Sequence, residues 1–136
     1  MMRGYDFIWR LARPLLPLML AWRARSGKED AARLTERFGR YDHRTDLPDD
    51  PLWIHAVSVG ETVAGIALAE AIRKTGETAP ILMTTNTVTA AARVAALPAS
   101  LGVTHLYQPL DHPDMVAAFL HRIRPRIALF LSLIHI

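Results

Sequence analysis

A single carboxylate, Glu61, stands where a short apolar run meets the start of an expected helix. Residues 52–57 are too short and too rich in β-branched and aromatic side chains to favour a helix, so they predict a strand. Residues 61–74 are rich in Ala, Leu and Ile and contain no proline, which predicts a helix. A carboxylate at a helix N-terminus is stabilised by the helix dipole and can accept a proton from a substrate hydroxyl group. The position therefore makes Glu61 a candidate general base.

The spacing of Ser58 and Glu61 also permits a purely structural interpretation. A serine followed three residues later by a glutamate can form a capping box, in which each side chain accepts a hydrogen bond from the other residue's backbone N–H. Spacing alone favours this cap over the catalytic role. Gly60 fits both interpretations, because a residue without a side chain lets a ligand approach the turn closely.

A second polar cluster ends the next expected strand, in the order Thr84, Thr85, Asn86 and Thr87. Four neighbouring hydroxyl or amide groups can bind the oxygen atoms of sugars or phosphates, together with backbone N–H groups of the following turn. The alternative is helix capping by Thr87 or Thr89, combined with the preference of threonine for strands. The residue types favour neither interpretation.

These residues need a scaffold, and the alternation of apolar runs with helical stretches predicts one. Strands are expected at residues 52–57, 80–85, 103–107 and 126–131, and helices at residues 61–74, 88–97 and 112–123. Strands separated by helices indicate right-handed crossovers and a parallel sheet, so the expected fold class is α/β and Rossmann-like. The carboxyl ends of such strands meet at one edge, which brings together the loops at 58–61, 84–87 and 108–111. Asp111 is expected to cap the third helix.

Composition narrows the class of protein further. The 136 residues are 51% hydrophobic and 21% charged, which suits one packed domain and argues against a disordered tail. There is no cysteine, which excludes disulfides, thiol nucleophiles and thiolate metal sites. Residues 1–40 carry nine Lys or Arg and four Asp or Glu, whereas residues 41–136 carry seven and nine. A basic N-terminal segment therefore precedes a slightly acidic domain.

Residues 1–25 predict a membrane anchor. Their uncharged run, residues 14–22, has nine residues, whereas spanning a bilayer takes about twenty. Trp9 and Trp22 lie among leucines and near several arginines, a pattern typical of a helix at the membrane surface that contacts anionic lipid. The alternatives are an amphipathic helix packed on a domain or a nucleic-acid-binding segment, and no recognised nucleic-acid motif supports the latter. Residues 26–51, with a short helix expected at 29–38, form a basic connector.

The sequence predicts neither a metal site nor a bound cofactor. Its six histidines lack paired spacings such as H-x-x-x-H, and no pair of carboxylates follows a strand to hold a divalent ion. His55 alternates within the first strand and is interpreted as a core residue. Neither G-x-G-x-x-G nor G-x-x-x-x-G-K-[ST] occurs, so a dinucleotide site or a phosphate-binding loop of these types has no support.

Three stretches carry a resemblance to a known family: R-L-T-E-R-F-G at residues 33–39, W-I-H-A-V-S-V-G-E at residues 53–61 and T-T-N-T at residues 84–87. In this order and spacing they resemble the N-terminal half of 3-deoxy-D-manno-octulosonic acid (Kdo) transferases, over residues 5–130. The resemblance implies a membrane-anchored glycosyltransferase of the two-Rossmann-domain (GT-B) type, inverting and independent of metal. Such an enzyme moves Kdo from CMP-Kdo to a lipid A precursor in lipopolysaccharide synthesis, at the cytoplasmic face of the bacterial inner membrane.

The resemblance also implies roles for individual residues. The glutamate of the family's S-V-G-E motif is the general base, and it corresponds to Glu61. Residues 52–130 would be an incomplete acceptor-binding domain, and CMP-Kdo would bind mainly to a C-terminal domain that this chain lacks. The lipid acceptor would contact a set of polar residues: Ser58, Gly60, Thr84, Thr85, Asn86, Thr87 and Arg37. Arg37 and its basic neighbours are candidates to hold phosphate groups.

Two positions depart from the family pattern. Asn86 stands where threonine is common, which keeps hydrogen-bonding capacity. After Phe130 the family continues into an acidic Glu-x-Glu stretch and Trp-Pro, whereas this chain reads L-S-L-I-H-I. We therefore expect residues 131–136 to be a non-native tail and the chain to be a fragment that is inactive by itself. The other class of function left open is a non-catalytic peripheral membrane or partner-binding α/β module.

Overall fold

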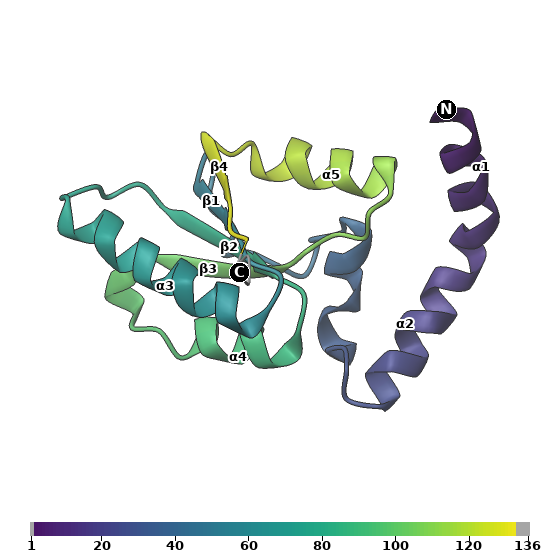
Figure 1. Ribbon diagram of the computed structural model, residues 1–136, viewed down its shortest axis with the longest axis horizontal. Helices are drawn as coiled ribbons and strands as arrows, with labels where there is room; N and C mark the ends of the chain where they lie inside the picture. The colour runs from purple at the N-terminus through teal and green to yellow at the C-terminus, as the bar shows by residue number, and fades with distance from the viewer. Residues whose placement is uncertain (1, 133–136) are drawn as a thin grey trace.

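The computed structural model describes residues 2–132 and contains a four-stranded parallel sheet (Figure 1). The strands lie in the order β3-β2-β1-β4, with the bounds β1 Leu52–His55, β2 Ile81–Thr85, β3 Val103–Tyr107 and β4 Ile127–Phe130. In the register, Ile54 of β1 lies opposite Met83 of β2 and Leu129 of β4. The predicted α/β class with a parallel sheet is confirmed.

Helices cover both faces of this sheet (Figure 1). α3 (Val59–Lys74) and α4 (Val88–Ala95) lie on one face and α5 (Pro113–Ile123) on the other, while η3 (Ala99–Leu101) is a short turn before β3. The chain winds outward from β1 through β2 to β3 and then crosses to β4 on the other side of β1. The direction of winding therefore reverses between β1 and β4. In open parallel sheets, ligands bind outside the carboxyl ends of the strands at such a point.

Alternate strand residues divide the core into two layers. On the side of α3 and α4, Ile54, Ile81 and Met83 pack with Ala69 and Val94. On the side of α5, the packed residues are Tyr41, Leu47, Trp53, Leu82, Leu106, Phe119 and Ile123. Burying one large apolar side chain stabilises a fold by roughly 1.5–3 kcal/mol. Because two members of the second layer come from residues 26–51, the expected connector forms part of the packed domain.

The end of β1 and the start of α3 differ from the sequence prediction, because a capping residue decides where the first domain helix begins. β1 ends at His55 rather than at residue 57. α3 begins at Val59 rather than at residue 61, since Ser58 has extended backbone angles and is the N-cap. The carboxylate of Glu61 consequently lies inside the first turn of α3 and not at its first residue.

The third domain helix has a different cap from the one expected. His112 is the N-cap of α5, and its Nδ1 accepts the backbone N–H of Asp114 at 3.2 Å. Pro113 occupies the first helical position, which needs no N–H donor. The prediction of Asp111 as the cap is therefore wrong, because the proline fixes the start of the helix one residue later.

The outer edge of β3 is covered by η2 (Ala31–Phe38), a 3₁₀ helix within the helical stretch expected at residues 29–38. An edge strand presents unpaired N–H and C=O groups. Glu36 accepts the N–H of Tyr107 at 3.1 Å, and Arg33 and Arg44 each donate to the carbonyl oxygen of His105 at 3.1 Å. Charged side chains thus bond to groups of β3 that a neighbouring strand would otherwise bind.

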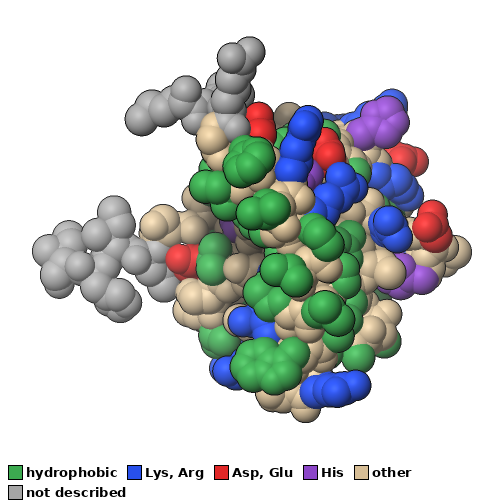
Figure 2. All heavy atoms as spheres, turned by 90° about the vertical axis from the view of Figure 1, so that its right-hand side faces the viewer, with side chains coloured by type: hydrophobic (Ala, Val, Ile, Leu, Met, Phe, Trp, Pro, Cys, Tyr) green, Lys and Arg blue, Asp and Glu red, His purple; other side chains and the backbone are tan. Residues whose placement is uncertain are grey.

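The N-terminal segment forms α1 (Met2–Ala12), the 3₁₀ turn η1 (Arg13–Leu15) and α2 (Leu16–Arg25). Leu16 and Leu20 are buried. The other side exposes a set of large apolar residues, called here the outer stripe: Phe7, Ile8, Leu11, Leu15, Leu18, Met19 and Trp22. Figure 2 shows hydrophobic side chains gathered on this side of the molecule, with Lys and Arg side chains around them. None of the described helices is both long enough and apolar enough to cross a membrane.

The expected tail at residues 131–136 falls mostly outside the described residues. Leu131 donates its N–H to the carbonyl oxygen of His55 at 3.0 Å, which continues the pairing of β4 with β1. Residues 133–136 lie outside the described part of the chain. Their non-native origin stays a prediction.

Candidate functional site

A cavity of about 200 Å³ opens at the sheet edge where the winding reverses, and we call it the crevice cavity. β1 contributes Trp53 and His55, and β4 contributes Phe130. The loop after β3 and the first half of α5 complete the wall with Gln108, Pro109, Asp111, Val116 and Phe119. A mostly apolar lining with a few polar groups is typical of small-molecule sites.

Glu61 lies in the first turn of α3, which begins at the same edge of the sheet. Oγ of Ser58 accepts the N–H of Glu61 at 3.2 Å, while Oε2 of Glu61 accepts the N–H groups of Val57 at 2.7 Å and Ser58 at 3.3 Å. The capping box favoured by spacing is therefore confirmed. Gly60 is exposed in the same turn. Capping and proton transfer are compatible, because the cap holds the carboxylate at the helix N-terminus, where the dipole favours negative charge.

His55 lines the crevice cavity, and the charge of Glu61 acts on its pKa. Its side chain is buried, and its Nδ1 lies 2.8 Å from Oγ1 of Thr84, which also accepts the indole N–H of Trp53 at 2.8 Å. Because an indole can only donate, Thr84 can give its own hydrogen to Nδ1, and the ring proton is then on Nε2. Burial lowers the pKa of His55 below its ordinary value, although the charge of Glu61 opposes this shift. His55 is therefore a neutral ring that responds to Glu61.

The threonine cluster is divided between the interior and the surface. Thr84 and Thr85 are fully buried, and Oγ1 of Thr85 lies 2.8 Å from Nε2 of His105. Thr87 is the N-cap of α4 and accepts the N–H of Ala90 at 3.1 Å, as the capping alternative required. The hydroxyls of Thr84 and Thr85 thus belong to internal hydrogen bonds, and acceptor binding by this cluster stays a prediction.

Arg37 lies inside the molecule and joins two loops of the site edge. Its side chain is buried, and the guanidinium donates to Oδ1 of Asn86 at 2.8 Å and to the carbonyl oxygen of Gln108. Its Nε lies 3.8 Å from a carboxylate oxygen of Glu29. Burial lowers the pKa of Arg37, and the charge of Glu29 opposes the shift. The structure therefore gives Arg37 a positioning role for the loops after β2 and β3, and phosphate binding by it stays a prediction.

The structure brings the predicted residues together as two groups on one sheet edge. Ser58, Gly60 and Glu61 form the N-cap and first turn of α3, which follows β1, whereas Arg37 holds Asn86 beside the loop after β3. The predicted loop at residues 108–111 does line the crevice cavity. The lining residues that were not predicted come from the strands and from α5: Trp53, His55, Val116, Phe119 and Phe130. The available indication was a histidine at the end of the first strand, but alternation along the strand favoured a core position.

These features define a class of protein. An open parallel sheet with helices on both faces, a cavity at its winding reversal and a carboxylate at the adjoining helix N-terminus are the features of a Rossmann-like α/β domain. Comparison with known proteins gives the particular family. The family described as 3-deoxy-D-manno-octulosonic-acid transferase (kdotransferase) matches residues 32–133, and the chain belongs to this family.

Individual relatives agree with the family match. The chain is 34% identical over 133 residues to a probable mitochondrial 3-deoxy-D-manno-octulosonic acid transferase of Arabidopsis thaliana, covering 93% of this chain and 29% of the relative. It is 32% identical to the 3-deoxy-D-manno-octulosonic acid transferase of Rickettsia bellii (97% of this chain, 31% of the relative) and 35% identical to that of Bordetella pertussis (88% and 30%). The chain spans about three-tenths of the length of these relatives. No solved structure gives a significant match.

Proposed function

We propose that this chain is the acceptor-binding part of a Kdo transferase and that Glu61 is its general base. The parent enzyme would transfer Kdo from CMP-Kdo to a lipid A precursor in lipopolysaccharide synthesis. The observation that carries the proposal is the position of Glu61, which two backbone N–H groups fix at the helix N-terminus, on the sheet edge where the crevice cavity opens. Family membership supports the class of reaction.

In the proposed reaction Glu61 removes the proton from a hydroxyl group of the acceptor sugar. The hydroxyl oxygen attacks the anomeric carbon of Kdo as the bond from that carbon to the phosphate oxygen of CMP breaks. CMP leaves with the bonding electron pair, and Glu61 carries the proton. Attack from the side opposite CMP inverts the anomeric configuration. A positioned carboxylate base contributes on the order of 10²–10⁴-fold to such a step.

The donor would be held by a second domain of a longer, two-domain GT-B protein. The crevice cavity of about 200 Å³ is small for a nucleotide sugar, which supports assigning the donor elsewhere. The charge that develops on the departing phosphate would also be stabilised from that second domain. Under this proposal the present chain supplies the base and contacts with the acceptor, needs no metal, and is inactive alone.

The parent protein would act at the cytoplasmic face of a bacterial inner membrane. The outer stripe of α1 and α2 supports attachment, because it exposes seven large apolar side chains next to basic ones such as Arg10 and Arg25. Co-sedimentation with vesicles that contain anionic lipid tests this part. Removal of residues 1–25 should abolish binding, and unchanged binding of the shortened chain would contradict membrane attachment.

The base is tested by Glu61→Gln in the full-length protein that contains this chain. Glutamine can still complete a capping box but cannot take a proton, so folding should persist while Kdo transfer falls on the order of 10²–10⁴-fold. Glu70→Gln, at an exposed position of the same helix, is the matched control and should keep full activity. Retained transfer in Glu61→Gln would contradict the catalytic role and favour the alternative, a non-catalytic peripheral membrane or partner-binding module.

A further inference from the structure

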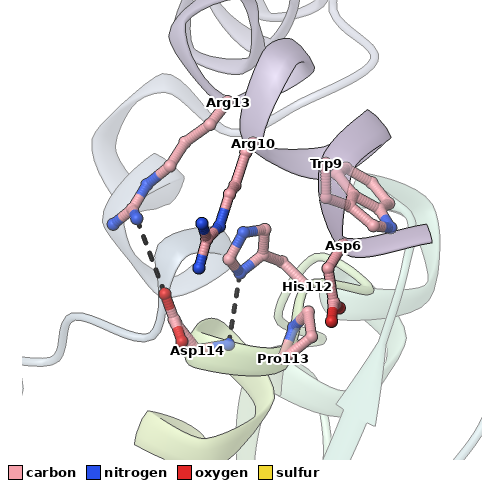
Figure 3. A pocket seen from close by; sticks show the side chains of 7 residues that line it. All are labelled: Asp6, Trp9, Arg10, Arg13, His112, Pro113 and Asp114. Atoms are coloured by element: carbon pink, nitrogen blue, oxygen red, sulfur yellow. Dashed lines mark hydrogen bonds and ion pairs between the residues drawn. The ribbon is translucent and has the colours of Figure 1, made fainter. Parts of the chain in front are cut away.

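A second cavity, of about 410 Å³, lies between the N-terminal helices and the start of α5, and Glu61 is not among the residues that line it. We call it the seam cavity. α1 and η1 contribute Asp6, Trp9, Arg10 and Arg13 to its wall, and α5 with its cap contributes His112, Pro113 and Asp114. Figure 3 shows the side chains of α1 and η1 reaching toward the residues of α5. The family resemblance and the proposed reaction assign no role to it.

The seam cavity and the outer stripe lie on different sides of the same N-terminal segment. Residues 6, 10 and 13 recur at helical spacing and share one side of the N-terminal segment, whereas Phe7, Ile8 and Leu11 are exposed on another. The Tyr5 hydroxyl donates to Oδ2 of Asp111 at 3.0 Å and so fixes α1 beside the domain. If the outer stripe enters the apolar part of a membrane, the seam cavity lies at its flank, at the depth of lipid headgroups.

The charged residues of the seam cavity are only partly paired. Arg13 lies 3.5 Å from Asp114, so these two charges offset each other. Among residues 4–132, whose side chains the structure describes, none forms a hydrogen bond or ion pair with the side chain of Arg10 or Asp6. The cavity therefore offers one cation, Arg10, and one anion, Asp6, to a ligand. At the N-terminus of α5, His112 already caps the helix and Asp114 already places a negative charge in the first turn.

His112 adds a directed donor to this arrangement. Its side chain is 5% exposed, and its Nδ1 accepts the N–H of Asp114, so the ring proton is on Nε2. The ring also packs edge to face against Trp9, with centroids 5.9 Å apart. The cavity thus has donors at Arg10 and His112 and an acceptor at Asp6.

We propose that the seam cavity binds the headgroup of a phospholipid that carries both a phosphate and a primary ammonium group, as phosphatidylethanolamine does. Arg10 and the His112 N–H bind the phosphate, and the carboxylate of Asp6 accepts hydrogen bonds from the ammonium group. A cation and an anion that have no partner among the side chains of residues 4–132 match a zwitterion better than a simple anion. The proposal rests on the membrane attachment proposed above and adds the identity of a lipid partner.

The test compares vesicles of phosphatidylcholine alone with vesicles in which part of it is replaced by phosphatidylethanolamine or by phosphatidylglycerol. Choline has no N–H to donate to Asp6, so the chain should bind the ethanolamine vesicles roughly three- to tenfold more tightly than pure phosphatidylcholine. Asp6→Asn and Arg10→Gln should each remove this preference. Both side chains are exposed and without partners in the described chain, so the variants should fold, which circular dichroism checks.

Arg25→Gln is the matched control, because Arg25 is exposed on α2 outside the seam cavity. It should lower binding to phosphatidylglycerol vesicles but keep the preference for ethanolamine. A preference that persists in Asp6→Asn would overturn the proposal, since ethanolamine lipids would then act through membrane packing. Tighter binding to the phosphatidylglycerol vesicles alone, or no binding to any vesicle, would overturn the proposal as well.

A soluble headgroup tests binding to the seam cavity in the absence of a membrane. Glycerophosphoethanolamine should shift the ring proton resonances of His112 in a saturable way, and Asp6→Asn should abolish the saturation. An equal effect of inorganic phosphate, or no shift, would contradict recognition of the zwitterion. Glu61→Gln lies outside this cavity and tests only the base, so the two proposals can fail separately.

Discussion

Two glutamates 25 positions apart in the sequence occupy opposite kinds of environment. Glu36, at the outer edge of β3, is fully buried and accepts hydrogen bonds from Arg33 at 2.7 Å, His43 at 3.1 Å and the Tyr107 N–H at 3.1 Å. Glu61, at the carboxyl edge, is partly exposed and takes backbone N–H groups of its own turn. The first carboxylate is enclosed by its partners, whereas the second can meet a ligand.

The difference shows how burial and partners separate a structural charge from a candidate catalytic one. Burial alone would raise the pKa of Glu36, but the hydrogen bonds of Arg33 and the Tyr107 N–H, with the charge of Arg33, lower it below its ordinary value. That carboxylate is stabilised as an anion and closed to substrate.

Glu36→Gln should destabilise the fold by about 3–5 kcal/mol. The substitution keeps the shape of the side chain but leaves the charges of Arg33 and Arg44 without their buried counterion, and breaking one partner of a buried ion pair is costly. Urea unfolding followed by circular dichroism measures the effect. Glu70→Gln, at an exposed site, is the control and should change little. A loss below about 1 kcal/mol would mean that the network at the β3 edge is dispensable.

Acidification should destabilise the fold in two stages. Burial lowers the pKa of His105 from 6.5 to about 3, so on acidification the unfolded chain binds a proton before the folded chain does. As the pH falls from 6.5 to about 3, the free energy of unfolding therefore decreases by about 1.4 kcal/mol per pH unit. The pKa of Glu36 is also lowered, so its contribution is complete above about 4.5 and is lost as the pH falls through its folded value. Thermal unfolding between pH 7 and about pH 3 follows both stages.

Variants assign the two stages to their residues. His105→Gln should flatten the dependence between pH 6.5 and 4.5, and Glu36→Gln should keep that part and lose the additional slope at lower pH. Burial also lowers the pKa of His55, so a smaller slope of the same sign should remain in His105→Gln. Stability that is constant down to pH 4 would contradict a buried, neutral His105.

The fold was predictable from sequence because its determinants are local and periodic. The apolar runs that became β1 to β4 and the helical stretches between them specify a parallel sheet without any knowledge of tertiary contacts. The ends of elements were less predictable, since Ser58 and Pro113 decide them through single capping positions. A cap depends on backbone angles that composition does not determine.

The site was predictable only where one short stretch builds it. Ser58 and Glu61 interact across three residues, so their spacing was sufficient. The partners of Arg37 are Asn86 and Gln108, which are 49 and 71 residues away. Whether a basic side chain faces solvent or a buried carbonyl depends on such long-range contacts, so the sequence could not place Arg37 inside the molecule.

Ser58→Ala should destabilise the chain by about 1 kcal/mol, in the range found for lost N-caps. The change removes the acceptor for the Glu61 N–H at 3.2 Å but leaves the core untouched. Ser58→Thr keeps a capping hydroxyl and should recover most of the loss. Urea unfolding compares the unsubstituted protein with the two variants. A loss of stability in Ser58→Ala as large as that of Glu36→Gln would show that the two regions contribute equally to the fold.

Glu61→Gln should have the smallest effect on folding, about 0.5 kcal/mol. The amide oxygen can still accept the N–H groups of Val57 and Ser58, so the substitution keeps these hydrogen bonds and removes the attraction of a negative charge to the helix dipole. Urea unfolding at pH 7 measures the difference, with Glu61→Ala as the matched variant that also loses both hydrogen bonds and should cost more. A small change in stability beside a large loss of Kdo transfer is the combination expected of a catalytic carboxylate on an intact cap. A destabilisation of several kcal/mol would instead assign Glu61 the structural role that Glu36 has, and lost activity would then carry no information about the base.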